Sequence, residues 1–480
     1  MDDKKGVIRE LNADDFANHD VKRGPSFRSL ESKEQYETAR SAAAAKRQAV
    51  SEPPREEAAE TKRAKKKRRI DLSEMDTSFL HPAKDESMKV GKDDFAFPIN
   101  LTVLGCVALL SLFGVVMVAS SSYYYAYTYM GDSLYFLGKQ IMWLLIGGIV
   151  LIVAAIFPMK WIKRLSLVIY ALSVFFCVAV LFFGETVNGS TRWLNIAGIS
   201  FQPAEFAKLG VAIYVAVLVE QYQTKIKKPG MFLALFSVTI IPAILVGIEN
   251  LTSALIIAVI GFAIMFVGGC RFKGFFLFVF PVALLILAAL VAPIILSRVY
   301  GDEWASVLPG FLQKLFNSFM YRTDRISSWI NPWKEATGGG YQTVQALYAV
   351  GSGGFFGRGL GNSLQKLGFI PEAHNDIIFA VICEELGVFG AAIVIVLFSI
   401  LVFEGIKIAA NAQDRFAGYV TAGITAQIGL QAILNMAVNL NLVPTTGVSL
   451  PFISYGGTSL VFLMASVGLM LNASRRAPGR

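Results

Sequence analysis

The sequence predicts an all-α membrane protein that crosses the bilayer ten times, with both termini on the cytoplasmic side. Three observations lead to this fold class. Only 16% of the 480 residues are charged and 54% are hydrophobic, whereas soluble globular proteins carry about 25% charged residues. Long apolar runs follow one another after Phe95. The Lys and Arg residues between these runs gather on one side of the membrane if ten runs span it.

The first 95 residues form a separate region that is rich in Lys, Glu, Ala and Asp. This composition predicts a disordered basic tail in the cytoplasm. A basic run at 62–69 has two possible roles. Its charge either serves only to retain the tail on the cytoplasmic side, or it also attracts anionic headgroups or a protein partner. Residues 1–30 contain no apolar core of a signal peptide, so the first membrane helix is expected to direct insertion.

The apolar runs have the length of membrane helices, which need about 20 residues to cross the hydrocarbon. The break between the fifth and sixth runs, at 249–252, is short enough for a tight turn. The predicted spans make up a membrane domain at 96–474, and residues 475–480 form a cytoplasmic end. The spans lie near residues 97–120, 136–157, 164–184, 203–220, 231–248, 252–269, 274–296, 377–404, 417–440 and 449–472.

Basic residues of the short loops fix the orientation, because cytoplasmic loops carry an excess of Lys and Arg. Every basic loop follows an even-numbered span, on the side of the N-terminal tail. The residues are Lys160, Lys163, Arg164, Lys225, Lys227, Lys228, Arg271, Lys273, Lys407, Arg415, Arg475 and Arg476. The largest outward connection then runs from 297 to 375, between helices 7 and 8. Its stretch 304–320 is amphipathic and is predicted to lie at the membrane interface.

Cysteine and histidine usage excludes several classes of site. All four cysteines lie within or at the ends of apolar runs, so no disulfide framework is predicted. Only His374 lies beyond the tail. This argues against a metal site with several His ligands and against a Ser-His-Asp triad within the membrane domain.

Ionisable residues inside membrane spans are costly and mark candidate sites. Glu205 and Lys208 open the fourth span three residues apart, so they share one helix face. They form either a structural ion pair or an ammonium that Glu205 holds toward an anionic substrate group. Asp376 precedes the eighth span and is either a helix cap or a general base at the outer surface.

Three further patterns remain open between structure and function. Glu384 and Glu385 are adjacent and point in different directions, so at most one is expected to face a given cavity and the other to bond a neighbouring helix. Gln427, Gln431, Asn435 and Asn439 recur every four residues, which predicts a polar helix face turned inward, for hydrogen bonds between helices or for a cavity. The Gly-rich stretch 351–361 lacks the βαβ context of a nucleotide site. It is predicted to be a tight, flexible loop against the membrane, with Arg358 and Lys366 near a phosphate.

Longer motifs resemble one family. The SEDS family, which includes the FtsW, RodA and SpoVE proteins, has similar outer-loop and helix signatures in the same order, and the match is closer to FtsW proteins than to RodA proteins. The resemblance covers residues 97–474. Its motifs are 188–194 with 201–208, 340–342 with 351–361, 366–376 followed by 384–387, and 444–459. The chain departs from the family at Asn375, where Thr is frequent, at Ile377, where Phe is frequent, and at Ser200, where some members carry Arg.

The resemblance implies a ten-helix enzyme that polymerises lipid II into peptidoglycan strands during cell division and releases undecaprenyl pyrophosphate. Asp376 takes the position of the essential acid. A lipid II flippase and a non-catalytic scaffold for a class B penicillin-binding protein are the alternatives. The residues expected to bind substrate are Arg192, Gln202, Glu205, Lys208, Arg325, Tyr341, Gln342, Arg358, Lys366, Glu372, His374 and Ser454.

The same resemblance sets expectations for cofactors, partners and location. No cofactor is certain, and a divalent cation, Mg²⁺ or Mn²⁺, is left open. Lipid II, a class B penicillin-binding transpeptidase and other membrane proteins of the division machinery are the expected partners, and nucleic acid is not. The expected location is the bacterial cytoplasmic membrane at the division septum.

Overall fold

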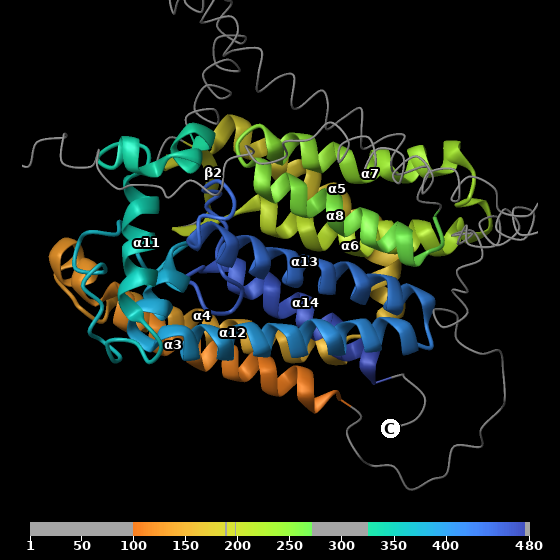
Figure 1. The fold of residues 1–480 in the computed structure, drawn as a ribbon. Helices are drawn as coiled ribbons and strands as arrows, with labels where there is room; N and C mark the ends of the chain where they lie inside the picture. Colours follow the sequence, from red (N-terminus) through yellow and green to blue (C-terminus); the bar gives the residue numbers. More distant parts are fainter. Residues whose placement is uncertain (1–98, 188–189, 197, 271–324, 476–480) are drawn as a thin grey trace, which may run out of the picture. The chain divides into compact units, whose positions relative to one another are not determined.

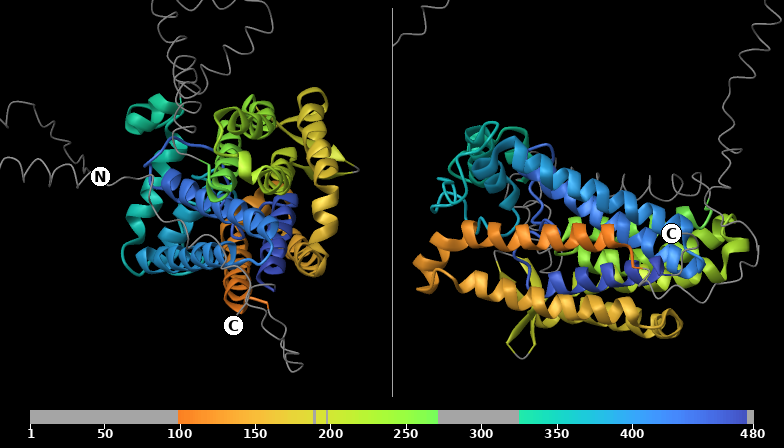
Figure 2. Two further views of the ribbon diagram at one scale, coloured as in Figure 1. Left: turned by 90° about the vertical axis from the view of Figure 1, so that its right-hand side faces the viewer. Right: turned by 90° about the horizontal axis from the view of Figure 1, so that it is seen from below.

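Long apolar helices lying side by side make up most of the structure (Figures 1 and 2). The computed structural model describes residues 99–187, 190–196, 198–270 and 325–475. The predicted tail 1–95, the seventh span at 274–296 and the amphipathic stretch 304–320 lie outside these residues. The helices of the first half are α3 (Leu101–Met130), α4 (Tyr135–Ile156), α5 (Met159–Phe183), α6 (Pro203–Gln221), α7 (Pro229–Gly247) and α8 (Leu251–Val267). The second half contributes α11 (Tyr341–Gly353), α12 (Ile378–Asn411), α13 (Arg415–Asn439) and α14 (Thr458–Ser474), and short 3-10 turns occur at Gln223–Lys225 and Pro332–Glu335.

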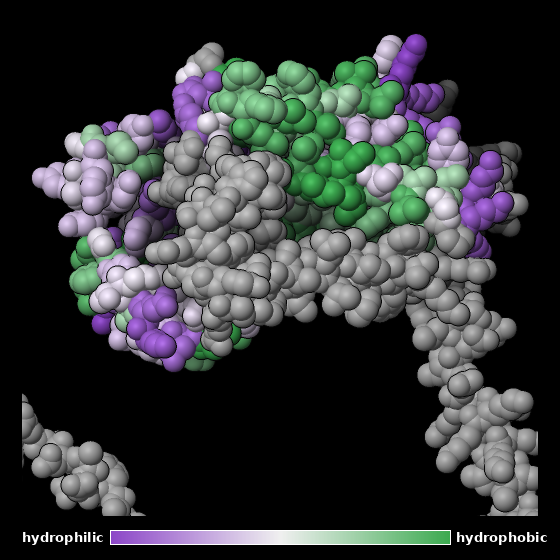
Figure 3. Space-filling model, turned by 90° about the horizontal axis from the view of Figure 1, so that it is seen from above, coloured by the Kyte–Doolittle hydropathy of each residue, from purple (hydrophilic) through white to green (hydrophobic). Residues whose placement is uncertain are grey.

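Helix composition supports a multi-pass membrane protein. Six of the described helices, α3, α4, α5, α7, α12 and α13, are long and apolar enough to cross a membrane, and α8 and α14 are shorter apolar helices. On one face of the molecule, hydrophobic side chains cover the middle and hydrophilic ones gather toward the ends (Figure 3). An apolar surface between two polar ends is what a bilayer requires.

Helix boundaries follow local chemistry. The Asn100 side chain accepts hydrogen bonds from the first turn of α3, and Asn250 does the same for α8, as expected for N-cap residues. Pro203 occupies the first turn of α6, where a missing N–H costs nothing. The predicted tenth span began too early: α14 starts at Thr458, because a proline and paired glycines interrupt 449–457.

Residues 185–201 correct the prediction of an all-α protein. They form a small antiparallel sheet of β1 (Glu185–Val187), β2 (Ser190–Ile196) and β3 (Ile199–Phe201), in the order β1-β2-β3. Leu194 pairs with Phe201 across β2 and β3. An Asn-Gly dipeptide separates β1 from β2 in the sequence, and this dipeptide is the strongest short-range signal of a β-hairpin. A prediction from hydropathy alone does not detect it.

Helix α13 has a central place, since it contacts α6, α8, α12 and α14. Its predicted polar face does turn inward: Gln427, Gln431, Asn435 and Asn439 are all buried. Helix α6 is buried along most of its length and packs on α5, α8 and α13. The N-terminal end of α6 and the C-terminal half of α13 meet the connection 444–457, which precedes α14.

Helix α12 breaks at Gly387, and the Gly-rich loop fills the break. Gly387 has φ 66° and ψ −162°, a conformation that essentially only glycine adopts. Loop residues 354–359 supply backbone partners on both sides of the break. The four hydrogen bonds run from Arg358 N to Glu384 O, Gly359 N to Glu385 O, Val388 N to Gly354 O and Phe389 N to Phe355 O, at 2.9, 2.9, 3.1 and 3.2 Å.

Gly387→Ala is expected to destabilise the protein. A Cβ at Gly387 would lie 2.4 Å from both Gly357 N and Phe355 O, and the backbone strain alone costs about 1–3 kcal/mol. The thermal unfolding midpoint of the purified protein in detergent should fall. Gly148→Ala in α4 is the matched control, because a Cβ there meets nothing within 4 Å. An equal midpoint for both variants would contradict the role assigned to the break.

Candidate functional site

Asp376 stands at the outward start of α12 without serving as its cap. The helix begins after Ile377, which is the N-cap residue and makes no side-chain cap bond. Asp376 as a residue is partly exposed, while burial is the largest influence on the pKa of its carboxyl group. Asp376 is therefore not the N-cap residue of α12, and the helix-cap interpretation is wrong.

The charges of two arginines and one glutamate act on the Asp376 carboxylate. Burial raises the pKa of Asp376 above its usual 3.8, whereas Arg325 and Arg192 lower the pKa and Glu372 raises it. Arg325 Nη1 donates to Thr445 O at 2.9 Å, and Arg192 Nε donates to Glu249 O at 3.1 Å. Both guanidinium groups are thus fixed by outward connections while their positive charge acts on Asp376.

Glu372 has a strained backbone close to this carboxylate. Its φ of 48° lies in the left-handed region, which is uncommon for residues other than glycine. Asn375 Nδ2 donates to its carboxylate at 2.7 Å, and Asn375 N donates to its carbonyl at 2.9 Å. These two bonds hold the turn that leads into Asp376.

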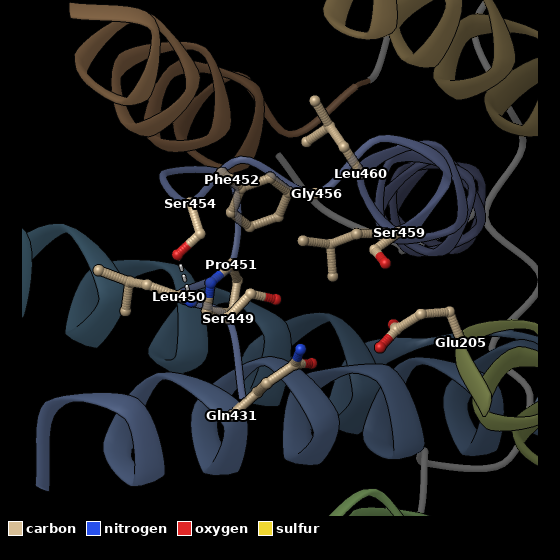
Figure 4. A pocket seen from close by; sticks show the side chains of 11 residues that line it. Glu205, Gln431, Ser449, Leu450, Pro451, Phe452, Ser454, Gly456, Ser459 and Leu460 are labelled. Atoms are coloured by element: carbon tan, nitrogen blue, oxygen red, sulfur yellow. Dashed lines mark hydrogen bonds between the residues drawn. The ribbon is translucent and has the colours of Figure 1, made fainter. Parts of the chain in front are cut away.

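Glu205 and Lys208 form a buried ion pair, with Nζ to Oε1 at 2.6 Å. The Lys208 side chain is 1% exposed, and its ammonium lies 3.5 Å from Gln431 Oε1. Glu205, in contrast, lines a small pocket beside the last outward connection. Figure 4 shows the side chains of Glu205 and Gln431 pointing toward each other from α6 and α13, with Ser449 and Ser459 nearby.

Ser454 and Gln202 adjoin the same region. Ser454 lines the pocket and accepts a hydrogen bond from Leu450 N at 2.8 Å, which closes the turn. Gln202 Oε1 lies 3.4 Å from the hydroxyl of Ser459, another lining residue. The fourth-span motif and the last outward motif therefore meet at one pocket.

Glu384 and Glu385 both bind side chains of the segment 358–366. Glu384 binds Arg358 Nη1 at 3.1 Å and the Ser363 hydroxyl at 2.5 Å. Glu385 binds Lys366 Nζ at 2.7 Å and also the Ser120 hydroxyl of α3, which is the predicted contact with a neighbouring helix. Both carboxylates are 0% exposed. Arg358 and Lys366 are paired with these acids rather than directed at the Asp376 region.

His374 is part of an aromatic cluster. It is 2% exposed, and its ring centroid lies 4.2 Å from that of Phe136, 5.6 Å from Tyr125 and 5.7 Å from Tyr455. Burial lowers the pKa of His374 to about 4, so the imidazole is neutral at neutral pH. Tyr341 and Gln342 are half-buried in the first turn of α11.

The described residues provide no set of ligands for a divalent cation. No group of three or more His, Cys, Asp or Glu residues in the described part of the chain could hold a metal ion. Around Asp376, Glu372 is accompanied by Arg192 and Arg325, whose positive charges repel a cation.

Comparisons with known proteins identify the family of the chain. A family model described as "cell cycle protein", which covers FtsW, RodA and SpoVE, matches residues 100–478. A probable peptidoglycan glycosyltransferase FtsW from Geobacter sp. strain M18 is 34% identical over 385 residues, which are 79% of this chain and 98% of that protein. Stage V sporulation protein E of Bacillus subtilis is 34% identical over 386 residues, with 79% and 97% coverage.

Solved structures share the fold. One is a peptidoglycan synthase complex described in terms of coordinated polymerization and crosslinking, with a TM-score of 0.60, 22% identity and coverage of 80% of this chain and 99% of that chain. Another is the rod shape determining protein RodA of Thermus thermophilus, with a TM-score of 0.52, 21% identity and coverage of 80% and 98%. The chain belongs to the FtsW, RodA and SpoVE family.

Proposed function

We propose that this protein is a peptidoglycan glycosyltransferase that polymerises lipid II at the outer face of the cytoplasmic membrane during cell division. The observation that carries the proposal is the Asp376 carboxylate, on which the charges of Arg192 and Arg325 act and which lies with Arg192 beside the backbone of Gly447. Relatives that match most of the chain at 34% identity are probable peptidoglycan glycosyltransferases. Ten spans with both termini inside, and a septal location, are part of the same proposal.

Asp376 acts as the general base. A hydroxyl of the acceptor sugar loses its proton to the carboxylate as its oxygen attacks the anomeric carbon of the donor. The bond from that carbon to undecaprenyl pyrophosphate breaks, and the negative charge of the leaving group grows. A single displacement converts an α-linked donor into a β-linked product.

Arg192 and Arg325 stabilise the pyrophosphate charge. Fixed cations in a site that is shielded from water need no reorganisation when charge develops. Both arginines are anchored by hydrogen bonds to backbone carbonyls, which provides this fixed geometry. Arg358 and Lys366 have the different task of holding the Gly-rich loop to α12.

The outward location of the acid favours polymerisation over transport. A flippase needs a polar path through the membrane, whereas the Lys208–Glu205 pair is buried between α6 and α13. A scaffold needs no carboxylate at Asp376. A class B penicillin-binding transpeptidase remains the proposed partner, since a structural relative is a peptidoglycan synthase complex.

The purified protein should convert lipid II into glycan strands, and the rate should depend on pH through Asp376. The base works only when ionised. Because burial raises the pKa of Asp376, kcat should decline with falling pH at a value above the usual 3.8. Glycan length and kcat would be measured by gel analysis of labelled lipid II between pH 4 and 9, with and without the transpeptidase.

Two results would count against the proposal. The first is transport of lipid II across proteoliposomes with no polymer under any of these conditions. The second is an acidic limb of the kcat profile at or below the pKa of an ordinary aspartate.

A further inference from the structure

Two buried asparagines of α13 bind the backbone of Asp376. Asn435 Nδ2 donates to Asp376 O at 2.7 Å, and Asn439 Nδ2 donates to the same oxygen at 2.9 Å. Their exposed fractions are 1% and 0%. The carbonyl oxygen of the candidate base therefore receives two side-chain donors from a single helix.

Asn435 also binds a second outward segment. The same Nδ2 donates to Val448 O at 2.7 Å, so both hydrogens of this amide are used. One carbonyl belongs to the segment 371–377 before α12, and the other belongs to the connection 444–457 before α14. One rigid amide thus sets the distance between two non-helical segments.

The second of these segments lies beside the Asp376 carboxylate. Gly447, the neighbour of Val448, has φ 66°, and a Cβ built on it would lie 3.8 Å from Asp376 Oδ2 and 3.4 Å from Arg192 Nη1. The backbone at Gly447 is thus close to both charged groups. A shift of either segment would change the distance between the base and this backbone.

Asn439 ties the same unit to α12. Its Oδ1 accepts a hydrogen bond from Ala380 N at 2.9 Å, in the first turn of α12. The hydrogen bonds of Asn439 reach Asp376, Ala380 and Asn435, whereas those of Asn435 also reach Val448 in the segment 444–457. The two asparagines therefore have separable roles.

We propose that Asn435 is a positioning residue for Asp376: its amide holds the Asp376 carbonyl and the Val448 carbonyl at a fixed separation, and Asn439 holds the same aspartate to α12. This inference rests on the proposed function, in which Asp376 is the base. Both side chains are buried and donate to the Asp376 carbonyl, so they act through Asp376. Catalytic groups displaced by about 1 Å can lose about 10²-fold in rate.

Asn435→Leu keeps the approximate size of the side chain and removes both donors. Its kcat for lipid II polymerisation should fall about 10²-fold, with KM nearly unchanged. The acidic limb of the kcat profile should move to lower pH, because a loosened segment lets water reach Asp376 and lowers its raised pKa. Gln427→Leu is the matched control, since Gln427 is buried on the same face of α13, two turns from Asn435.

Hydrogen exchange measured by mass spectrometry tests the same inference without activity. Asn435→Leu should raise amide exchange in both 371–377 and 444–450. Asn439→Leu should raise exchange in 371–377 and leave 444–450 as in the wild type. Gln427→Leu should raise exchange in neither segment, whatever its effect on the unfolding midpoint.

These outcomes separate the inference from the proposed function. Wild-type protein that makes no glycan would remove the proposed function, and the exchange pattern would still decide whether Asn435 positions the two segments. Unchanged exchange in Asn435→Leu would overturn the inference. A loss of kcat that Gln427→Leu reproduces, with the pH profile unmoved, would overturn it as well.

Discussion

Asp376→Asn is expected to abolish lipid II polymerisation while the protein still folds and inserts. The amide has the shape of the carboxylate but cannot accept a proton, and loss of a general base lowers kcat by about 10²–10⁴-fold. The unfolding midpoint should not fall, because burial already disfavours the charged form of Asp376, as the raised pKa indicates. The two measurements are kcat with labelled lipid II and the unfolding midpoint of the same preparation.

Asp132→Asn is the matched control for this variant. Asp132 is an exposed acid between α3 and α4, and its carboxylate accepts a hydrogen bond from Leu134 N at 2.9 Å. The control should retain wild-type kcat. Normal polymerisation by purified Asp376→Asn would remove the proposed base, and a matching loss in Asp132→Asn would show that the assay reports a general effect of altered surface charge.

Helical periodicity predicted much of the described fold. The spacing of Gln427, Gln431, Asn435 and Asn439 predicted a buried polar face on α13, and all four are buried. The paired helices α7 and α8 meet at the short turn predicted at 249–252. These features are local, and a single helix face or one turn is sufficient to encode them.

Long-range pairing was not predictable in the same way. The sequence predicts that Arg358 and Lys366 are loop cations available to a phosphate. In the structure, each forms an ion pair with a glutamate of α12. Their partners depend on the break at Gly387, which brings the loop against α12. Hydrophobicity does not predict the small sheet at 185–201, because its sequence signal is the turn chemistry of a hairpin.

In the candidate site, too, local features were predictable from the sequence and contacts between distant segments were not. Asp376 was identified from its motif, but its neighbours Arg192 and Arg325 come from separate outward connections. Their approach depends on how the helix bundle brings those connections together. The two asparagines that hold the Asp376 carbonyl belong to a third element, α13. The sequence predicts that their side chains turn inward, but it does not predict that they bind Asp376.

Lys208→Met is expected to be strongly destabilising. The substitution leaves the Glu205 carboxylate without its ammonium partner in a buried position, and breaking a buried pair on one side costs about 3–5 kcal/mol. The unfolding midpoint should therefore fall sharply. Lys163→Met is the matched control, because the Lys163–Glu220 pair joins α5 to α6 with side chains 42% and 23% exposed, and exposed pairs contribute about 0–1 kcal/mol.

The double variant Glu205→Gln/Lys208→Met separates the structural role of this pair from its chemical role. Replacing both members of a buried pair by neutral side chains is often nearly neutral for stability, so the midpoint should recover. Polymerisation should stay at least about tenfold below wild type, since the pocket loses the Glu205 carboxylate and a charge-assisted hydrogen bond is worth about 1.5–3 kcal/mol. If activity returned together with stability, the pair would serve only to hold α6 against α13, and substrate binding would have to depend on the arginines beside Asp376.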